Sequence, residues 1–575
     1  MLRGVTAGSR AAPAGDLSRH YRRPDPGQLA ARVEELARAC DAASSGDQVC
    51  ALIRTWNEVR CGVETSANLS FIRFQQDTRD KEARAEEEFW SDTRPLLREL
   101  DVLHARTLLR SRFRDAIDAT FGGQLLRLKD CAERTFAPAI RRSVAEEAHL
   151  VLRYEELRAR TEIEFRGETL NLDGIAAHFS SADRHTRMLA QQAAEKFLER
   201  HAAELDDLFD GLVKLRDAMG RGVGFDSFTP LGYRLQVRPD YGPAEVAVFR
   251  DEVRREITPR VEAVFRARAR RLGIPKLLFH DEAVADPRGN PRPLGDAAFC
   301  LKQARRAYHE LGPETAEFID MMIDRGHLDL DCRPGKAGGG FSAPLPDVGA
   351  PFVFANLNGS WRDAGILTHE LGHALQCHRS RGQPLLEYAS ATSEIAEIHS
   401  FGSELLCHPW MDLFFGAAEA DRFRRLHLEN TLVMMVHQAA GDAFQHEVYA
   451  NPGLLPAQRH ALWNDVLRTY LPGRDYGGHF PYLERGTGWA AIMHFFRIPF
   501  YMIDYALAQT CALQLWVRAQ TDRPRALRDY LALCDAGGSL PYQDTLRVAD
   551  LRSPLTPGCL GEVAGQLDRH LSESG

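Results

Sequence analysis

The sequence predicts a mainly α-helical fold with one small β-sheet. Residues 81–121 and 183–220 are rich in helix-forming residues, and their apolar side chains recur at the spacing of a helix face. Neither segment keeps a heptad repeat, so packed antiparallel helices are favoured over a long coiled coil. A single strand-like run, residues 351–359, lies between turn residues. At 575 residues the chain exceeds one simple core, so we expect more than one subdomain.

The chain divides by composition into three parts. Residues 1–26 contain much Arg, Ala, Gly and Pro but no apolar stretch of signal-peptide length, which favours a disordered tail over a secretory signal or a transit peptide. Residues 27–221 predict helix after helix and form an N-terminal helical lobe. From residue 222 to residue 575 Gly and Pro are frequent at first, and the chemically distinctive motifs lie here. We therefore expect the functional site in residues 222–575.

Composition excludes several classes of partner. A net charge of -8 provides no basic field for nucleic acid. The 11 cysteines form no CxxC pairs, which favours reduced thiols over a disulfide framework or a cysteine-based zinc module. The most apolar segment, residues 498–517, contains Asp504 and two Gln, so a buried helix fits it better than a membrane span. We predict a cytoplasmic protein with no nucleic-acid or membrane partner.

One short motif indicates metal chemistry. Residues 369–373 read His-Glu-Leu-Gly-His, and two His four residues apart lie on one face of a helix. Both imidazoles can then bind one zinc ion, while Glu370 lies beside them and can take a proton from a metal-bound water. The alternative for these residues is a buried polar network without metal.

A catalytic zinc needs a third protein ligand and an open fourth position. The extended motif that ends in a third His is absent, because Gln376 and Arg379 occupy its Gly and His positions. His378 follows His373 by five residues and points away from the metal face of a helix. The third ligand must therefore come from a later element.

An acidic helix is predicted over residues 390–404. Glu397 and Glu404 are two turns apart on one face of this helix. Burying carboxylates there is unfavourable unless a positively charged group faces them. One can bind the metal and the other can hold a ligating His through its second nitrogen. Spacing alone leaves Glu387, Glu394 and Glu397 open as the ligand.

Four segments carry a resemblance to a known family. They are residues 334–341, 351–359, 367–374 and 397–400. Together they resemble the M3 family of zinc oligopeptidases, and especially its bacterial Pz-peptidase-like oligoendopeptidases. In that family the third ligand opens a Glu-x-x-Ser segment at about the distance from the first His that Glu397 has, 28 residues. The resemblance thus implies one zinc ion per chain on His369, His373 and Glu397, with Glu404 as a support behind a ligand.

A late aromatic segment supplies candidates for the rest of the site. His494, Tyr501 and Tyr505 lie in it, and the two tyrosines are four residues apart, on one helix face. Without the family this segment reads as an aromatic core helix. The M3 family carries a His followed by spaced tyrosines that face the zinc. The resemblance therefore implies that His494 and Tyr501, and also Tyr505, bind substrate or stabilise the oxyanion, beside Glu370 as the base.

The resemblance also implies a fold and a function. The fold is a two-lobed, helical, zincin-type metallopeptidase with a small sheet beside the active-site helix and a deep central channel. We expect the strand at 351–358 to be a sheet edge to which an extended peptide adds. The implied function of residues 222–575 is hydrolysis of internal bonds in short unstructured peptides. The alternatives are an exopeptidase, such as a dipeptidyl carboxypeptidase, and a catalytically silent peptide-binding protein.

Overall fold

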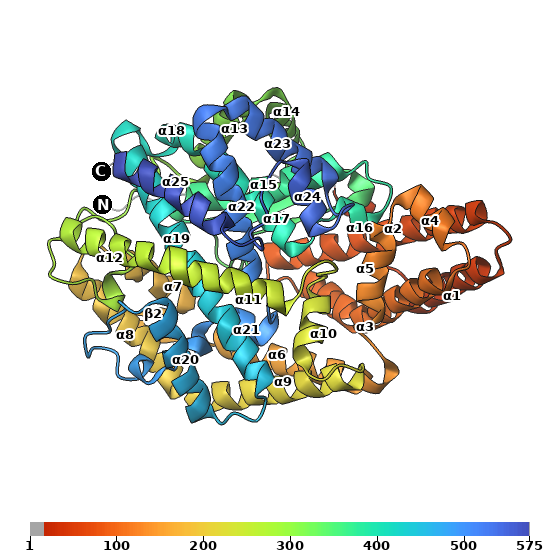
Figure 1. Cartoon of the computed structure of the whole chain (residues 1–575), viewed down its shortest axis with the longest axis horizontal. Helices are drawn as coiled ribbons and strands as arrows, with labels where there is room; N and C mark the ends of the chain where they lie inside the picture. The colour runs from red at the N-terminus through yellow and green to blue at the C-terminus, as the bar shows by residue number, and fades with distance from the viewer. Residues whose placement is uncertain (1–16, 574–575) are drawn as a thin grey trace, which may run out of the picture.

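Helices dominate the computed structural model, which describes residues 17–573. The first five helices form an arm that projects from the body of the molecule (Figure 1). They are α1 (Pro26–Ala42), α2 (Gly46–Gln76), α3 (Lys81–Arg110), α4 (Arg114–Phe121) and α5 (Gln124–Glu133). Asp25 and Asp80 cap α1 and α3 by accepting hydrogen bonds from backbone N–H groups of their first turns. Pro95 lies inside α3 without ending it, so the helix predicted from residue 81 continues to Arg110.

The other helices build the body around the largest hydrophobic core. They are α6 (Arg141–Ala159), α7 (Leu172–Ala177), α8 (Arg184–Arg200), α9 (Ala202–Gly222), α10 (Phe228–Leu235), α11 (Pro243–Glu252), α12 (Thr258–Leu272), α13 (Ala297–Leu311), α14 (Pro313–Asp324), α15 (Arg362–Ser380), α16 (Leu386–Ala389), α17 (Ser393–Leu406), α18 (Met411–Phe415), α19 (Ala417–Ala450), α20 (Pro456–Tyr470), α21 (Met493–Arg497), α22 (Met502–Thr521), α23 (Arg523–Ala536), α24 (Tyr542–Val548) and α25 (Cys559–Glu573). This core includes side chains from Val102 to Leu567, on both sides of the predicted boundary at residue 221. The division into lobes 27–221 and 222–575 stays a prediction.

The predicted buried helix at residues 498–517 is present as α22. Most of its side chains, including Asp504, are buried in the core. Within residues 17–573, none of the helices has the length and apolar character that crossing a membrane requires.

A three-stranded sheet lies next to α15, as expected, but its strand order corrects one prediction. The strand predicted at 351–358 is β5 (Phe352–Leu357). It pairs in parallel with β3 (Leu328–Asp331) and antiparallel with β4 (Phe341–Ala343), so the order is β3-β5-β4. The expectation that β5 is an edge strand is therefore wrong. Its side chains are almost all buried, which fits a central strand.

A second, smaller sheet was not predicted. Strands β1 (Ile163–Phe165) and β2 (Glu168–Leu170) form an antiparallel hairpin. Arg166 and Gly167 form its two-residue turn, and both have positive φ angles of 54° and 85°. This backbone matches the twist of short hairpins, in which Gly is common at such positions.

The first described residues fall within the predicted tail. Residues 1–16 lie outside the described part of the chain. Leu17 is buried against Leu69 and Ile72 of α2 and against Phe352 and Phe354 of β5. The predicted tail therefore contains one buried side chain at Leu17, and its extent over residues 1–26 stays a prediction.

A buried ion cluster joins the arm to the body. Glu387 on α16 accepts hydrogen bonds from Arg60 on α2, at 2.6 Å, and from Lys129 on α5. The side chains of Lys129 and Glu387 are only 5% and 12% exposed. Burial alone would raise the pKa of Glu387, but Lys129 and Arg60 outweigh it and hold the pKa well below its usual value.

We predict that Glu387→Gln lowers the free energy of unfolding by about 3 kcal/mol, because it leaves the buried Lys129 ammonium without a counter-charge. Urea denaturation measures this. The matched control is Glu34→Gln, which breaks an exposed i,i+4 pair with Arg38 and should change the same quantity by less than about 0.5 kcal/mol. If both substitutions lower the free energy of unfolding by equally small amounts, the buried ion cluster does not stabilise the fold and the prediction is wrong.

Candidate metal centre

The helix that carries the metal motif starts directly after the central strand. Asp363, in the first turn of α15, accepts hydrogen bonds from the backbone N–H groups of Asn358, at 3.1 Å, and Gly359, at 2.7 Å. Its other oxygen accepts from the Ser360 hydroxyl at 3.1 Å. One carboxylate thus closes the turn between β5 and α15 and fixes the direction in which α15 leaves the sheet.

Gly372 brings α15 and α17 into close contact. A Cβ atom at this position would lie 2.5 Å from the backbone oxygen of His399 and 2.9 Å from the Cα of Ser400. Only glycine fits at such distances, so the backbone of α17 approaches the metal motif closely. This approach places Glu397 opposite the two motif histidines.

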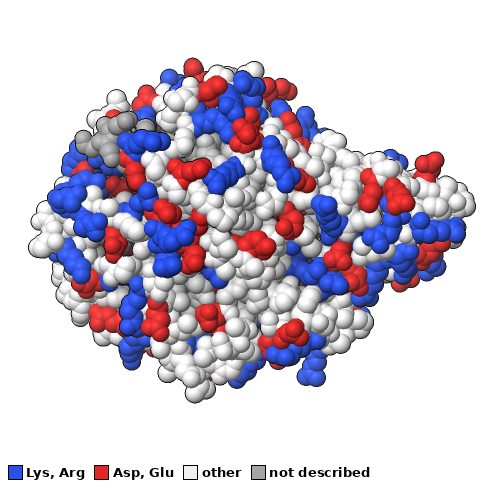
Figure 2. Space-filling view, in the orientation of Figure 1, with Lys and Arg blue, Asp and Glu red and all other residues white. Residues whose placement is uncertain are grey.

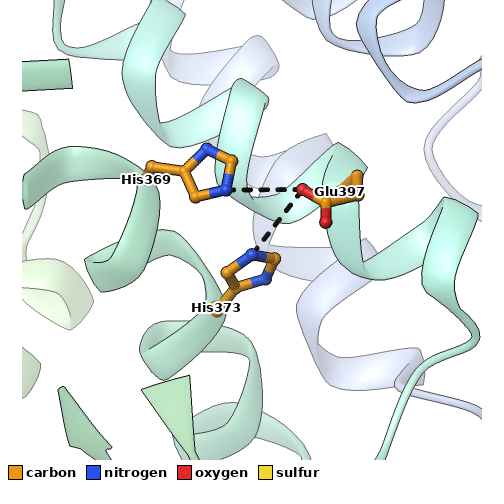
Figure 3. Close-up of side chains that lie close together, drawn as sticks. All are labelled: His369, His373 and Glu397. Atoms are coloured by element: carbon orange, nitrogen blue, oxygen red, sulfur yellow. Dashed lines mark ion pairs between the residues drawn. The ribbon is translucent and has the colours of Figure 1, made fainter. Parts of the chain in front are cut away.

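The three predicted metal ligands lie together. His369 and His373 project from successive turns of α15 and face Glu397 of α17 (Figure 3). His369 Nε2 is 3.4 Å and His373 Nε2 is 3.7 Å from Glu397 Oε2. One ligand atom from each residue lies within 4.8 Å of the others.

The geometry of this cluster fits a tetrahedral zinc ion. Zn–N and Zn–O bonds of 2.0–2.2 Å at tetrahedral angles put neighbouring ligand atoms about 3.3–3.5 Å apart. The two N···O distances from Glu397 to the histidines, 3.4 and 3.7 Å, are close to that value. Two imidazoles and one carboxylate also form a donor set that zinc uses in catalytic sites, with one position left for water.

The protonation states of the three predicted ligand residues favour the binding of a cation. Burial lowers the pKa of His373 to about 4, so its imidazole is neutral and can bind a metal. Burial opposes charge on Glu397, but the two histidines outweigh it and hold the pKa of Glu397 at about 2. Burial also opposes charge on His369, yet Glu397 and Glu404 raise its pKa well above the usual value. The carboxylates therefore stabilise positive charge here, and a divalent ion would displace a proton from His369.

Glu370 lies beside this cluster, where its carboxyl group is almost completely shielded from solvent. It is 7% exposed, and its Oε2 has no hydrogen-bond partner among the described residues. A Cβ atom on Gly340, just before β4, would lie 2.9 Å from Glu370 Oε1, so a glycine leaves space at the carboxylate. Burial raises the pKa of Glu370 to about 7. The carboxyl is thus suited to gain and lose a proton near neutral pH.

The predicted support residue is in contact with a ligand. Glu404 Oε1 accepts a hydrogen bond from His369 Nδ1 at 2.7 Å. Its other oxygen, Oε2, lies 2.9 Å from Nε2 of His427 on α19. His427 Nδ1 is in turn 2.7 Å from Nε2 of His408. The resulting chain of hydrogen bonds holds Glu404, and through it the His369 ring, in one orientation.

The remaining candidates from the sequence lie elsewhere. Glu387 faces Arg60 and Lys129, as described above. Glu394 accepts from the Thr392 hydroxyl at 3.0 Å, and it is not part of the metal-ligand group. His378 points away from the cluster, as expected, and its ring packs against Phe318, with centroids 5.6 Å apart. Among the described residues, Glu397 is the one of the three glutamates left open by spacing that lies together with His369 and His373.

The late aromatic candidates also meet at this site. Tyr501, directly before α22, donates a hydrogen bond to Glu397 Oε1 at 2.8 Å. The rings of His494 and Tyr501 are nearly parallel, with centroids 5.9 Å apart, and Tyr505 lies 5.1 Å from Tyr501. Burial raises the pKa of both tyrosines, so both phenols keep their protons and can donate. Burial lowers the pKa of His494, which favours a neutral ring.

Sequence reasoning missed His427 and His408. They lie in α19 and in the turn before α18, and no short motif contains them. Their role depends on the side-chain contact between His427 of α19 and Glu404 of α17, which joins residues far apart in the sequence.

Two family models match this chain. Residues 18–136 match the Peptidase M3 N-terminal domain, and residues 302–563 match Peptidase family M3. Over 264 residues the chain is 24% identical to "Oligoendopeptidase F, chromosomal" of Lactococcus lactis subsp. cremoris. That alignment covers 44% of this chain and 42% of the relative, so the chain spans about two fifths of the length of this curated relative.

Solved structures are similar over nearly the whole chain. One described as oligoendopeptidase F has a TM-score of 0.92 and 39% identity, and the match covers 96% of this chain and 97% of the other. A structure of Pz peptidase A with an inhibitor has a TM-score of 0.92 and 36% identity, and the match covers 96% and 98% of the two chains. A structure described as oligoendopeptidase F from Bacillus anthracis str. Ames has a TM-score of 0.87 and 34% identity, with coverage of 96% and 97%.

Proposed function

Because this chain belongs to peptidase family M3, we propose that it is a zinc metallo-oligoendopeptidase that hydrolyses internal bonds of short unstructured peptides. The observation that carries the proposal is the grouping of His369, His373 and Glu397 within 4.8 Å, with Glu370 beside them. A bound zinc ion would polarise the scissile carbonyl and make a bound water acidic. Glu370 would accept the proton of that water and pass it to the leaving amine.

Preorganised donors complete the proposed mechanism. The tetrahedral oxyanion needs hydrogen bonds that are in place before the reaction. Tyr501, Tyr505 and His494 supply such donors, and their rings lie within 5.1–5.9 Å of one another. Tyr501 donates to Glu397 at 2.8 Å, so its phenol already lies beside the proposed metal ligands.

The sheet edge that we propose for the peptide is β4 rather than β5. β4 is the outer strand next to α15, and Gly340 precedes it beside Glu370. We propose that an extended peptide adds to β4 through main-chain hydrogen bonds, which leaves side-chain selectivity loose. A deep channel and a cytoplasmic location remain part of the proposal.

An exopeptidase and an endopeptidase differ in their products. Cleavage of a peptide of about ten residues with both ends blocked, followed by mass spectrometry, separates the two. We expect cuts at internal bonds of the blocked peptide, at the same rate as in a peptide of the same sequence with free ends. Release of dipeptides only from a free carboxyl end would support the exopeptidase alternative, and binding without any cleavage would support a silent peptide-binding protein.

We predict that Glu404→Ala weakens zinc binding by about 10–100-fold, because the His369 ring loses the partner that orients it. Competition with a fluorescent chelator measures this affinity. Glu404→Gln keeps an oxygen that can accept from His369 Nδ1 and should lose less. Unchanged affinity in Glu404→Ala would refute the supporting role.

A further inference from the structure

A strained segment directly precedes Tyr501. Phe500 is fully buried, and its φ angle is +66°. Such angles are uncommon for residues other than glycine, and a bulky side chain there indicates strain held by the surroundings. Among residues 17–573 only Arg166, Val237, Phe500 and Asp550 share this property without being glycine.

The second strained residue, Val237, lies in the segment that holds the first. Val237 has a φ angle of +53° just after α10, where a glycine commonly ends a helix. The two residues that flank Val237 in the sequence both donate hydrogen bonds to the backbone around Phe500. Gln236 Nε2 donates to the backbone oxygen of Pro499 at 3.0 Å, and Arg238 Nη2 donates to that of Phe500 at 2.7 Å.

A third side chain holds the same segment from α19. Gln445 Oε1 accepts a hydrogen bond from the backbone N–H of Phe500 at 2.8 Å. We call the three side chains Gln236, Arg238 and Gln445 the Phe500 clamp. All three residues are buried, with exposed fractions of the whole residue of 8%, 4% and 1%.

The clamp also holds the helix that carries the tyrosines. Arg238 Nη2 lies 2.5 Å from Oδ1 of Asp504, in the first turn of α22, and both side chains are 0% exposed. One nitrogen thus bridges the backbone before Tyr501 and a side chain after it. The Phe500 ring is packed so tightly that a Cβ on Gly232 would lie 2.6 Å from it. The hydrogen bonds of the clamp and the close packing of the ring at Gly232 therefore both restrict rotation about the Phe500 backbone.

We propose that the Phe500 clamp is a positioning device that fixes the Tyr501 phenol over the metal centre. The strain at Val237 and Phe500 sets the backbone direction at Tyr501, and the three buried hydrogen bonds keep that direction. The phenol then stays within hydrogen-bond distance of Glu397 and parallel to the His494 ring. This inference rests on the role in oxyanion stabilisation proposed above for Tyr501.

Gln445→Met tests the clamp, because Met keeps the length of the side chain and cannot accept the Phe500 N–H. We expect kcat to fall about 10-fold with KM changed less than about 3-fold, since misplacement of a donor affects the transition state most. In the Tyr501→Phe background the same substitution should change kcat less than 2-fold. Gln445→Glu retains an acceptor oxygen and should recover part of the loss.

The matched control is Gln438→Met. Gln438 is a buried Gln two turns earlier on α19, with 3% exposure. Its replacement should leave kcat unchanged in the wild type and in Tyr501→Phe. If Gln445→Met does not fold, Gln236→Met removes only the bond to Pro499 and should show the same dependence on Tyr501. Equal losses of kcat with and without the Tyr501 hydroxyl would overturn the clamp and leave the proposed function intact. Wild-type kcat in Tyr501→Phe alone would overturn the oxyanion role, and the clamp with it.

A readout without turnover uses the metal-free protein. Tyrosine labelled with ¹³C at Cζ gives one NMR signal for Tyr501, assigned by its loss in Tyr501→Phe. Gln445→Met should shift or broaden that signal, and Gln438→Met should not. An unchanged signal in Gln445→Met would contradict the clamp.

Discussion

Replacing Glu370 with Gln is expected to lower kcat/KM for peptide cleavage by about 10²–10⁴-fold, the usual contribution of a positioned proton-transfer group. Gln has nearly the same shape but cannot accept a proton from water. The effect should be large because burial raises the pKa of Glu370 to about 7 and its Oε2 is free of partners among the described residues. The rate of cleavage of an internally quenched peptide and the zinc content of the same sample measure the effect.

Glu195→Gln is the matched control for this substitution. Glu195 is also buried, at 5% exposure, and burial raises its pKa, but it accepts hydrogen bonds from Tyr482 and Leu483 away from the metal centre. We expect kcat/KM of this control to stay within about 2-fold of wild type. If Glu370→Gln keeps its zinc and cleaves at the wild-type rate, the proposed base is wrong.

Replacing Glu397 with Gln should have the second large effect, on zinc affinity. The negative charge of Glu397 is held by two histidines at 3.4 and 3.7 Å, and a neutral amide loses both the charge and the stronger metal bond. We expect a loss greater than the roughly 10–100-fold that is typical when a residue behind a ligand is changed. Equilibrium dialysis against buffered zinc measures the affinity.

Glu394→Gln is the control, because Glu394 is a buried carboxylate one turn earlier on the same helix and lies outside the ligand group. Burial raises the pKa of Glu394 and thereby favours its neutral form, which the amide of Gln resembles in shape and charge. Zinc affinity should stay close to wild type. Loss of zinc from Glu394→Gln with retention by Glu397→Gln would reverse the assignment.

Sequence patterns correctly predicted the features that depend only on residues close together in the chain. Helix periodicity places His369 and His373 on one face, and the same reasoning placed Glu397 and Glu404 together on α17. Both pairs lie as expected. The mainly helical fold was also predicted correctly, because long amphipathic segments need only their own sequence to be recognised.

Contacts between distant segments could not be predicted in this way. β5 was expected at an edge, yet β3 and β4 pair on both its sides, and strand pairing depends on residues outside the strand. His427 reaches Glu404 only because the fold brings α19 within side-chain reach of α17. The selection of Glu397 over Glu387 needed the family resemblance, since both residues open a Glu-x-x-Ser segment. Only the fold shows Glu387 bound to Arg60 and Lys129.

Metal titration tests the central claim most directly. Zinc is removed with a chelator, the protein is dialysed, and cleavage of an internally quenched peptide is followed as zinc is returned in measured amounts. We predict negligible cleavage without metal and a rate that rises in proportion to bound zinc up to one ion per chain. Full activity in the metal-free protein, or no cleavage after one zinc ion has bound, would contradict the account.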